Sequence, residues 1–348
     1  MSSYNNFLYV LNKPSIIFAF LMSVGMMIVN GWTDAPVNIA TALKSKAIGF
    51  KKAVLLSAIC NLLGAAAMFA LGNSVAINTL MLSGLTVQGS SALLGVISAM
   101  LSVIIWSLIA LYFGLPTSES HALLAALSGA AVALIGKDGF ITSQWLKVLL
   151  GLVLSTAPVM IFSFWLAVFL KKHANIGDST YKKLQILGAV MSSFAHGAQD
   201  GQKFAGILVL TTLLSSQKTY DNSLSIPLWA MAVSAFFISL GTLLGGRRII
   251  KSLDTFAPSD SASGFAADLS SSICLTIISL LGFPTGTTCA KTCAVFGAGF
   301  SETNSLKKNG KIKSMILAWV LTFPLCAIIS FILAKVLNLL IYPAFHNM

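Results

Sequence analysis

The chain has 348 residues, of which 56% are hydrophobic and only 9% are charged. Soluble domains carry about 25% charged residues, so this composition excludes an ordinary soluble protein. The formal net charge is +12, but 15 of the 22 Lys and Arg residues lie in four short segments between apolar runs. That clustering is typical of membrane topology and argues against a nucleic-acid-binding surface.

Ten apolar segments follow one another along the chain. Each is long enough to form a membrane-spanning helix or a large part of one, and helices are expected because lipid offers the backbone no other hydrogen-bond partner. The ten segments cover roughly residues 14–33, 53–72, 91–113, 118–136, 146–170, 184–210, 228–246, 262–282, 284–303 and 314–342.

Four basic clusters follow the first, fifth, seventh and ninth segments. If the chain crosses the membrane at every segment, all four clusters lie on the same side, which is cytoplasmic by the positive-inside rule. The connections at 73–90, 137–145 and 211–226 carry little net charge and are predicted outside, together with both termini. The clusters contain Lys44, Lys46, Lys51, Lys52; Lys171, Lys172, Lys182, Lys183; Arg247, Arg248, Lys251; and Lys307, Lys308, Lys311, Lys313.

The chain contains an internal repeat. Residues 114–130 align without gaps on residues 282–298, and Gly31–Asp34 aligns on Gly197–Asp200 at nearly the same shift. Each half holds five segments, an odd number, so the second half should enter the membrane from the opposite side. The sequence therefore predicts an all-α polytopic membrane protein with inverted repeats at 1–175 and 176–348, and with broken or re-entrant helices at the midplane.

Two aspartates, Asp34 and Asp200, lie where apolar helices meet Gly-rich and polar residues. Pro36 should break the first of these helices and free backbone carbonyls to line a cavity. A carboxylate beside free carbonyls suits a hard cation such as Na⁺, or a proton. The alternative is a pair of ordinary helix caps, which the duplication disfavours.

Clustered hydroxyl groups surround the starts of the fourth and ninth segments, directly after Pro116 and Pro284. A helix N-terminus with free amides and nearby hydroxyls binds phosphate-like anions, and inverted halves would bring two such ends to one ligand. The alternative is routine Ser and Thr capping. The hydroxyl groups belong to Thr117, Ser118, Ser120, Thr285, Thr287 and Thr288.

Other ionisable residues also fall inside the apolar segments. Lys203 and Lys291 have no basic counterpart in the first half, where Val37 and Leu123 align, and each could face the ligand or pair with an aspartate. His121 and His196 could titrate or could simply pack. Glu119 and Asp268 complete the set, without an assigned role.

At these residues the sequence resembles the inorganic phosphate transporter (PiT) family of ion-coupled symporters, from about Gly31 to Pro324. The family carries a Gly-x-Asn-Asp-x-x-Asn motif and a Gly-Leu-Pro-x-Ser-Thr-Thr-His motif in each half. The chain departs from the first motif at Thr33, Gln199, Val37 and Lys203, with Asn38 one place late. It departs from the second at Glu119 and Cys289.

The resemblance implies a secondary transporter that moves inorganic phosphate across the cell membrane with Na⁺ or H⁺ by alternating access, not an enzyme and without a cofactor. It implies that the aspartates, the Asn-type amides and the hydroxyl groups of the Pro-Thr and Pro-Ser loops form a shared site for phosphate and a cation. We predict that phosphate is bound by Asp34, Asn38, Thr117, Ser118, Ser120, Asp200, Lys203, Thr285, Thr287 and Thr288. We predict that the coupling ion lies at Thr33, Asp34, Asn38, Gln199 and Asp200, with Na⁺ as a candidate metal at the two aspartates. The partners are phosphate and the lipid bilayer, with no nucleic acid, and a homodimer is one option.

Three alternatives stay open. The same scaffold could carry another small anion or a zwitterion such as an amino acid, which competition by sulfate or arsenate would distinguish. A membrane-embedded phosphotransferase using His121 or His196 is less favoured, because the sequence has no nucleotide-binding loop or zinc spacing. A passive channel is also less favoured, because buried charges beside broken helices suit occlusion.

Overall fold

The computed structural model describes residues 14–71, 74–81, 90–173, 176–215, 226–302 and 309–340. Over these ranges the chain forms helices and no strand, which confirms the all-α prediction. The helices are α2 (Pro14–Thr33), η2 (Ala35–Ile39), α3 (Ala40–Lys44), α4 (Phe50–Leu71), α5 (Ser74–Met81), α6 (Ser90–Phe113), α7 (Glu119–Ile135), η3 (Gly136–Gly139), α8 (Thr142–His173), α9 (Asp178–Ser215), α10 (Leu228–Thr242), α11 (Arg247–Leu253), α12 (Ser261–Leu280), α13 (Thr287–Phe300) and α14 (Asn309–Leu340).

Each of the ten predicted apolar segments is a helix whose ends fall within a few residues of the prediction. Seven helices in the described part are long and apolar enough to cross a membrane, and α10 with α11 forms an eighth candidate that is bent by 71°. The sequence did not predict α5, α11 or the short helices after α2, because they are too short for apolar length to reveal them.

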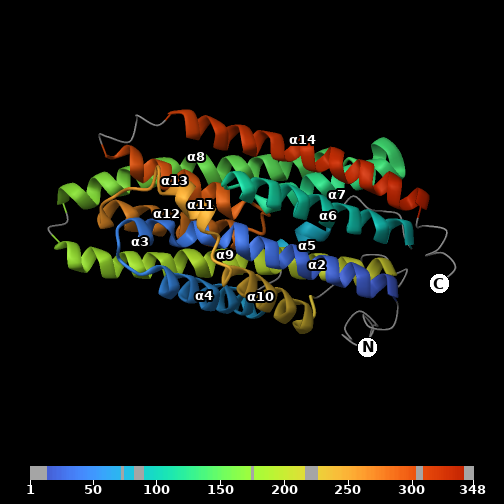
Figure 1. The fold of residues 1–348 in the computed structure, drawn as a ribbon, viewed down its shortest axis with the longest axis horizontal. Coiled ribbons are helices and arrows are strands. Elements are labelled where there is room, and N and C mark those ends of the chain that lie inside the picture. The colour runs from blue at the N-terminus through green and yellow to red at the C-terminus, as the bar shows by residue number, and fades with distance from the viewer. Residues whose placement is uncertain are drawn as a thin grey trace.

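The long helices run side by side along the longest axis of the molecule (Figure 1). The start of α2 and the end of α14 lie at the same end, while the end of α8 and the start of α9 lie at the other. Helix α2 therefore runs in one direction and α9 in the opposite one. Residues 1–13 and 341–348, and with them the predicted side of the termini, lie outside the described residues.

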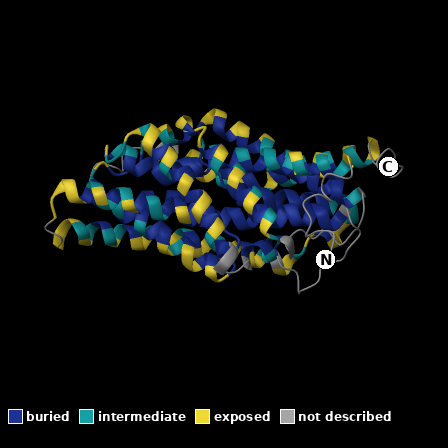
Figure 2. Cartoon of the chain, turned by 90° about the horizontal axis from the view of Figure 1, so that it is seen from below, coloured by how far each residue is buried: buried dark blue, intermediate teal, exposed yellow. Residues whose placement is uncertain are grey.

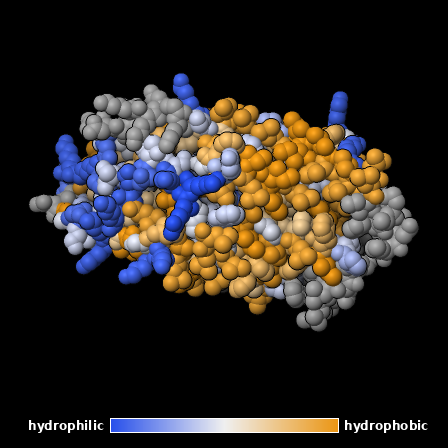
Figure 3. Space-filling model, viewed as in Figure 1, coloured by the Kyte–Doolittle hydropathy of each residue, from blue (hydrophilic) through white to orange (hydrophobic). Residues whose placement is uncertain are grey.

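Buried residues fill the interior of the bundle, and exposed residues line its outside (Figure 2). The outer faces are rich in large apolar side chains, including Trp165, Leu317 and Val320, each more than half exposed. Figure 3 shows them as a continuous apolar surface over the right-hand part of the molecule. An outward-facing apolar surface of this extent suits lipid, so the chain is a multi-pass integral membrane protein.

The basic clusters gather at the end opposite Pro14 and Leu340, where Figure 3 shows most hydrophilic side chains. Lys44, the last residue of α3, pairs with Asp254, directly after α11, at 3.3 Å. Lys171, near the end of α8, pairs at 2.9 Å with Asp260, which caps α12. That this end is cytoplasmic stays a prediction from the positive-inside rule. Lys307 and Lys308 lie outside the described residues, as do half of the connection 73–90 and most of the connection 211–226.

The predicted break after Asp34 is present. Helix α2 stops at Thr33, and the chain passes through the 3₁₀ segment η2 before α3 begins. Pro36 lies within η2, where it lacks the N–H that a continuous α-helix would need. The equivalent residue Asp200 instead lies inside the uninterrupted α9, because residues 201–206 contain no proline.

Helices of the first half pack closely on helices of the second. Gly129 of α7 lies against α14, where an added Cβ would come 2.8 Å from Ala327 Cα. Gly297 of α13, at the equivalent repeat position, lies against α8, where an added Cβ would come 2.9 Å from the Met160 carbonyl carbon. Small residues allow this close approach between membrane helices. The two halves are therefore interleaved.

Candidate functional site

Two loops with the same backbone geometry lead into α7 and α13. Gly114 and Gly282 each adopt a left-handed conformation, with φ of 68° and 75°, which favours glycine. Each glycine N–H bonds to the carbonyl three residues earlier, and the next N–H bonds to the carbonyl five residues earlier. The matched bonds are those that close a helix at its C-terminus, so both loops leave the preceding helix in the same way.

The N-termini of α7 and α13 meet near the centre of the molecule. Gly286, the N-cap of α13, lies so close to Ser118, the N-cap of α7, that an added Cβ would come 3.0 Å from Ser118 Cβ. In Figure 1 the two helices extend from this point toward opposite ends of the molecule. Two positive dipole ends therefore point into one region.

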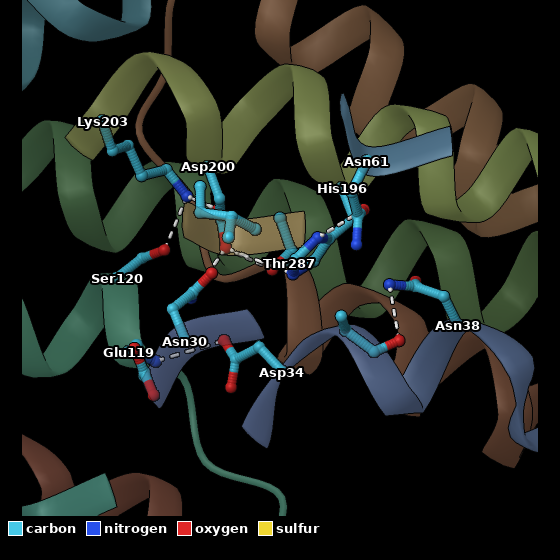
Figure 4. Close-up of polar contacts among 12 residues, drawn as sticks. Asn30, Asp34, Asn38, Asn61, Glu119, Ser120, His196, Asp200, Lys203 and Thr287 are labelled. Atoms are coloured by element: carbon cyan, nitrogen blue, oxygen red, sulfur yellow. Dashed lines mark hydrogen bonds and ion pairs between the residues drawn. The ribbon is translucent and has the colours of Figure 1, made fainter. Parts of the chain in front are cut away.

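Asp200 of α9 lies at the middle of the site, and its side chain is fully buried (Figure 4). Its Oδ1 accepts a 2.8 Å hydrogen bond from Lys203 Nζ, one helical turn later. Its Oδ2 accepts from Asn30 Nδ2 of α2 at 3.1 Å and from Thr287 Oγ1 of α13 at 3.4 Å. One carboxylate thus connects α2, α9 and α13.

Asp34 lies on the other side of the site, at the N-cap of η2. Its Oδ2 is 3.5 Å from the backbone nitrogen of Glu119, the first residue of α7. The Glu119 carboxylate accepts a 2.5 Å hydrogen bond from Thr33 Oγ1. Thr288 of α13 interacts with Asp34, although its hydroxyl oxygen completes no hydrogen bond of standard geometry within the described structure.

His196 of α9 and Asn61 of α4 extend the site toward α4. His196 Nε2 lies 3.3 Å from Asp200 Oδ2, and its Nδ1 lies 3.0 Å from Asn61 Oδ1. Asp34, His196 and Asp200 each have one ligand-type atom within 4.8 Å of the others, which is close enough to share a cation. The oxygen atoms of the two carboxylates suit Na⁺, whereas the imidazole nitrogen does not.

The predicted site residues are not all placed together. Asp34, Ser118, Ser120, Asp200, Lys203, Thr287 and Thr288 surround the region where α7 and α13 meet. Thr117, the residue before Ser118, is also buried. Thr33 is joined to the same region through Glu119.

Three predicted residues are engaged elsewhere. Asn38 donates to the Ala35 carbonyl and accepts from Ser192, to one side of the cluster in Figure 4. The Thr285 hydroxyl donates to Ser155 at 2.8 Å, so only its carbonyl faces Lys203. Gln199 donates to the Phe283 carbonyl at 2.9 Å and bonds to Ser279.

Lys291 belongs to a second polar cluster. Its ammonium contacts Asp268 Oδ1 at 2.5 Å, and Thr41 Oγ1 donates to the same oxygen at 2.6 Å. This pair links α12, α13 and α3. Of the two pairings left open for the buried lysines, Lys203 pairs with Asp200 and Lys291 pairs with Asp268.

Sequence reasoning did not assign Asn30 or Asn61 to the site. Asn30 comes directly before the first repeated motif, and Asn61 is an amide within the apolar α4. A polar residue inside a spanning helix is a functional candidate, so the signal was present at both positions. Only the packing of α2 and α4 on α9 shows that both reach the Asp200 region, Asn61 through His196.

The site is closed to solvent in this structure. Asp34 is 2% exposed and Asp200 is 0% exposed, and Glu119, Lys203 and Thr287 are also buried. Buried charges of this kind are stable only when they are paired and hydrogen-bonded. The candidate site is therefore enclosed by protein in this structure.

The chain matches the phosphate transporter family over residues 30–180 and 172–330. It is 29% identical over 318 residues to a probable low-affinity inorganic phosphate transporter of Bacillus subtilis, covering 90% of this chain and 94% of that protein. It is 31% identical over 331 residues to a protein of the same description from Rhizobium meliloti, covering 90% of this chain and 95% of the relative. A solved structure described as the sodium-dependent phosphate transporter has a similar fold, with a TM-score of 0.80, 22% identity, and coverage of 94% of this chain and 100% of that chain.

Proposed function

The chain belongs to the phosphate transporter family, and on that basis we propose that it is a secondary transporter that carries inorganic phosphate across the cell membrane together with Na⁺ or H⁺. It is a transporter and not an enzyme, as the descriptions of its relatives indicate. The bacterial relatives are described as transporters of inorganic phosphate, and the structural neighbour is described as sodium-dependent.

One observation carries the proposal: the N-termini of α7 and α13 meet beside Lys203 and Thr287, in a closed region between two aspartates. A phosphate oxygen could accept hydrogen bonds from first-turn amides of both helices and from hydroxyl groups next to them. Ser120, Thr287 and Thr288 supply these hydroxyls, and the Lys203 ammonium supplies a positive charge. The predicted contact of Asn38 with phosphate would require it to leave Ser192.

Coupling follows from charge. Phosphate is an anion, and Asp34 and Glu119 lie beside the position proposed for it without a lysine partner within the described residues. A bound Na⁺ or a proton would reduce this repulsion, so phosphate and the cation would each favour binding of the other. We place the coupling cation at Asp34 and the Oδ2 side of Asp200.

Alternating access is part of the proposal. The matched loops at Gly114 and Gly282, the opposite directions of α2 and α9, and the exchanged packing at Gly129 and Gly297 support two inverted repeats. Rocking of one repeat against the other would open the closed site first to one side and then to the other. The halves at 1–175 and 176–348 would be these two repeats.

Uptake of labelled phosphate into liposomes containing the purified protein tests the proposal. The sodium gradient and the proton gradient are imposed separately, and liposomes without protein are the control. We expect uphill uptake with at least one gradient, and competition by arsenate but not by sulfate. Uptake of sulfate or an amino acid in place of phosphate would show a different substrate, and uptake indifferent to both gradients would contradict coupling.

A further inference from the structure

The Lys203 ammonium is held by three oxygen atoms. Nζ lies 2.8 Å from Asp200 Oδ1, 2.5 Å from Ser120 Oγ and 2.5 Å from the backbone carbonyl oxygen of Thr285. These atoms come from α9, α7 and the loop before α13, and the lysine is only 2% exposed. The ammonium therefore lies at a junction of both halves of the chain.

The three partners form the kind of oxygen set that binds a hard monovalent cation. Carboxylate, hydroxyl and carbonyl oxygens are ligands for such ions, and an ammonium group carries the same single charge with three donors. In this structure Lys203 fills the oxygen cage with its own side chain. A free cation could enter the cage only if the lysine left it.

The internal repeat relates this cage to a counterpart around Asp34 that lacks the lysine. At the repeat shifts, Asp200, Ser120 and Thr285 correspond to Asp34, Thr288 and Thr117, and Lys203 corresponds to Val37. Thr288 interacts with Asp34, although its buried hydroxyl oxygen completes no hydrogen bond of standard geometry within the described structure. The counterpart thus keeps a carboxylate and a hydroxyl group but has no built-in positive charge.

We propose that Lys203 is a tethered cation that permanently occupies one of two repeat-related cation positions, so that only the Asp34 position exchanges a coupling cation. This inference rests on the proposed function, because it states how many cations accompany each phosphate. At this site the protein then moves no more than one Na⁺ or H⁺ per phosphate. Lys203 also holds α7 against α9 without binding an ion from solution.

The test compares the wild type with Lys203→Asn and Lys203→Met in purified protein. Lys203→Asn vacates the cage and adds an amide oxygen, whereas Lys203→Met vacates it and adds no oxygen ligand. Thermal stability and phosphate affinity are measured against NaCl, with choline chloride holding the ionic strength constant. These two readouts report Na⁺ binding even where transport is slow.

We expect at most one Na⁺ per protein in the wild type and one additional Na⁺ in Lys203→Asn. In that variant Na⁺ should raise the phosphate affinity by at least about fivefold more than in the wild type, the lower end of ordinary coupling between sites. Lys203→Met should lose phosphate affinity without gaining a response to Na⁺. A purely structural lysine would lower stability in both variants and create no new sodium response.

Two outcomes would overturn the inference. One is a Lys203→Asn protein that is folded and binds phosphate with the sodium response of the wild type. The other, which needs no variant, is a wild type that binds two or more Na⁺ or carries two or more per phosphate. Failure of the proposed function is distinguishable from both, because wild-type liposomes would then take up no phosphate under any gradient.

Discussion

Asn30 Nδ2 donates a 3.1 Å hydrogen bond to Asp200 Oδ2 across 170 residues of chain. Both side chains are fully buried, and the bond joins α2 of the first half to α9 of the second. A hydrogen bond to a buried carboxylate stabilises more than one between neutral groups. This contact therefore holds Asp200 Oδ2 in position, while Oδ1 binds Lys203.

Substituting Asn30 with alanine should weaken phosphate binding and lower stability by about 1–3 kcal/mol, because Asp200 loses a buried donor. Phosphate affinity and thermal unfolding in detergent measure the two effects. Ser91→Ala, which removes a peripheral bond to Asn338, is the control and should leave affinity unchanged. Equal affinity in Asn30→Ala and the wild type would show that this contact does not position the site.

The two aspartates should respond differently to replacement by asparagine. Asp200→Asn leaves the buried Lys203 without its charge partner, so we expect loss of uptake and a stability loss of roughly 3–5 kcal/mol. Asp34→Asn should also abolish coupled uptake but should leave stability equal or higher, because it removes a charge beside Glu119. Uptake in liposomes and thermal unfolding distinguish these outcomes. Full uptake by either variant would contradict the coupling mechanism.

The hydroxyl groups of Thr287 and Thr285 offer a matched pair. Thr287→Val removes a donor that faces Asp200, so the KM for phosphate should rise by about tenfold, the loss expected for one hydrogen bond to a charged group. Thr285→Val removes a bond to Ser155 and keeps the carbonyl that faces Lys203, so it should lower stability and leave KM nearly unchanged. The reverse pattern would show that the Thr285 hydroxyl turns toward phosphate.

Gly286 should tolerate no side chain. A Cβ there would come 2.8 Å from His121 Cε1 and 3.0 Å from Ser118 Cβ, so Gly286→Ala must push the α7 and α13 ends apart. We expect at least a tenfold loss of uptake, since small displacements in a binding site carry large penalties. Gly49→Ala, where an added Cβ meets nothing within 4 Å, is the control and should transport normally. Normal transport by Gly286→Ala would show that the two ends need not touch.

Asp260 and Glu302 form a carboxyl pair at the end that the sequence predicts to be cytoplasmic, beside Lys171. Burial and the neighbouring Asp260 raise the pKa of Glu302 above its ordinary value of 4.5. For Asp260, burial opposes ionisation, but hydrogen bonds with Glu302, Ser263 and Lys171 outweigh it and lower the pKa to about 2. The two carboxyl groups should therefore affect stability at different pH.

Between pH 4.5 and its raised pKa, Glu302 holds more proton in the folded state than in the unfolded state, so stability falls as pH rises. Glu302→Gln has no proton to lose, so the melting temperature of this variant should rise relative to that of the wild type between pH 5 and pH 7. Asp260→Asn should lower the melting temperature at both pH values, because the Asp260 contribution is lost only as pH falls toward 2. Its gap to the wild type should narrow from pH 5 to pH 7, because Asp260 also raises the pKa of Glu302. An unchanged gap between Glu302→Gln and the wild type would contradict the raised pKa.

Several features of the protein follow from the sequence alone. Apolar length located ten of the helices, because a membrane span demands about twenty apolar residues whatever its neighbours are. Pro36 located the break after Asp34, because proline lacks a backbone donor. The repeated Gly-Pro-Thr loops and the two repeated aspartates were sufficient to reveal the resemblance to the phosphate transporter family, because each motif is a short continuous stretch of the chain.

Tertiary structure decided what the motifs touch. Thr285 and Thr287 are two residues apart in one motif, yet one hydroxyl faces α8 and the other faces Asp200, because loop and helix geometry turn them to different sides. The sequence left open whether the Lys203 ammonium faces phosphate or forms an ion pair with Asp200. Its three oxygen partners come from segments about 80 residues away as well as from its own helix, and only the packing of α7, α9 and α13 brings them to one ammonium group.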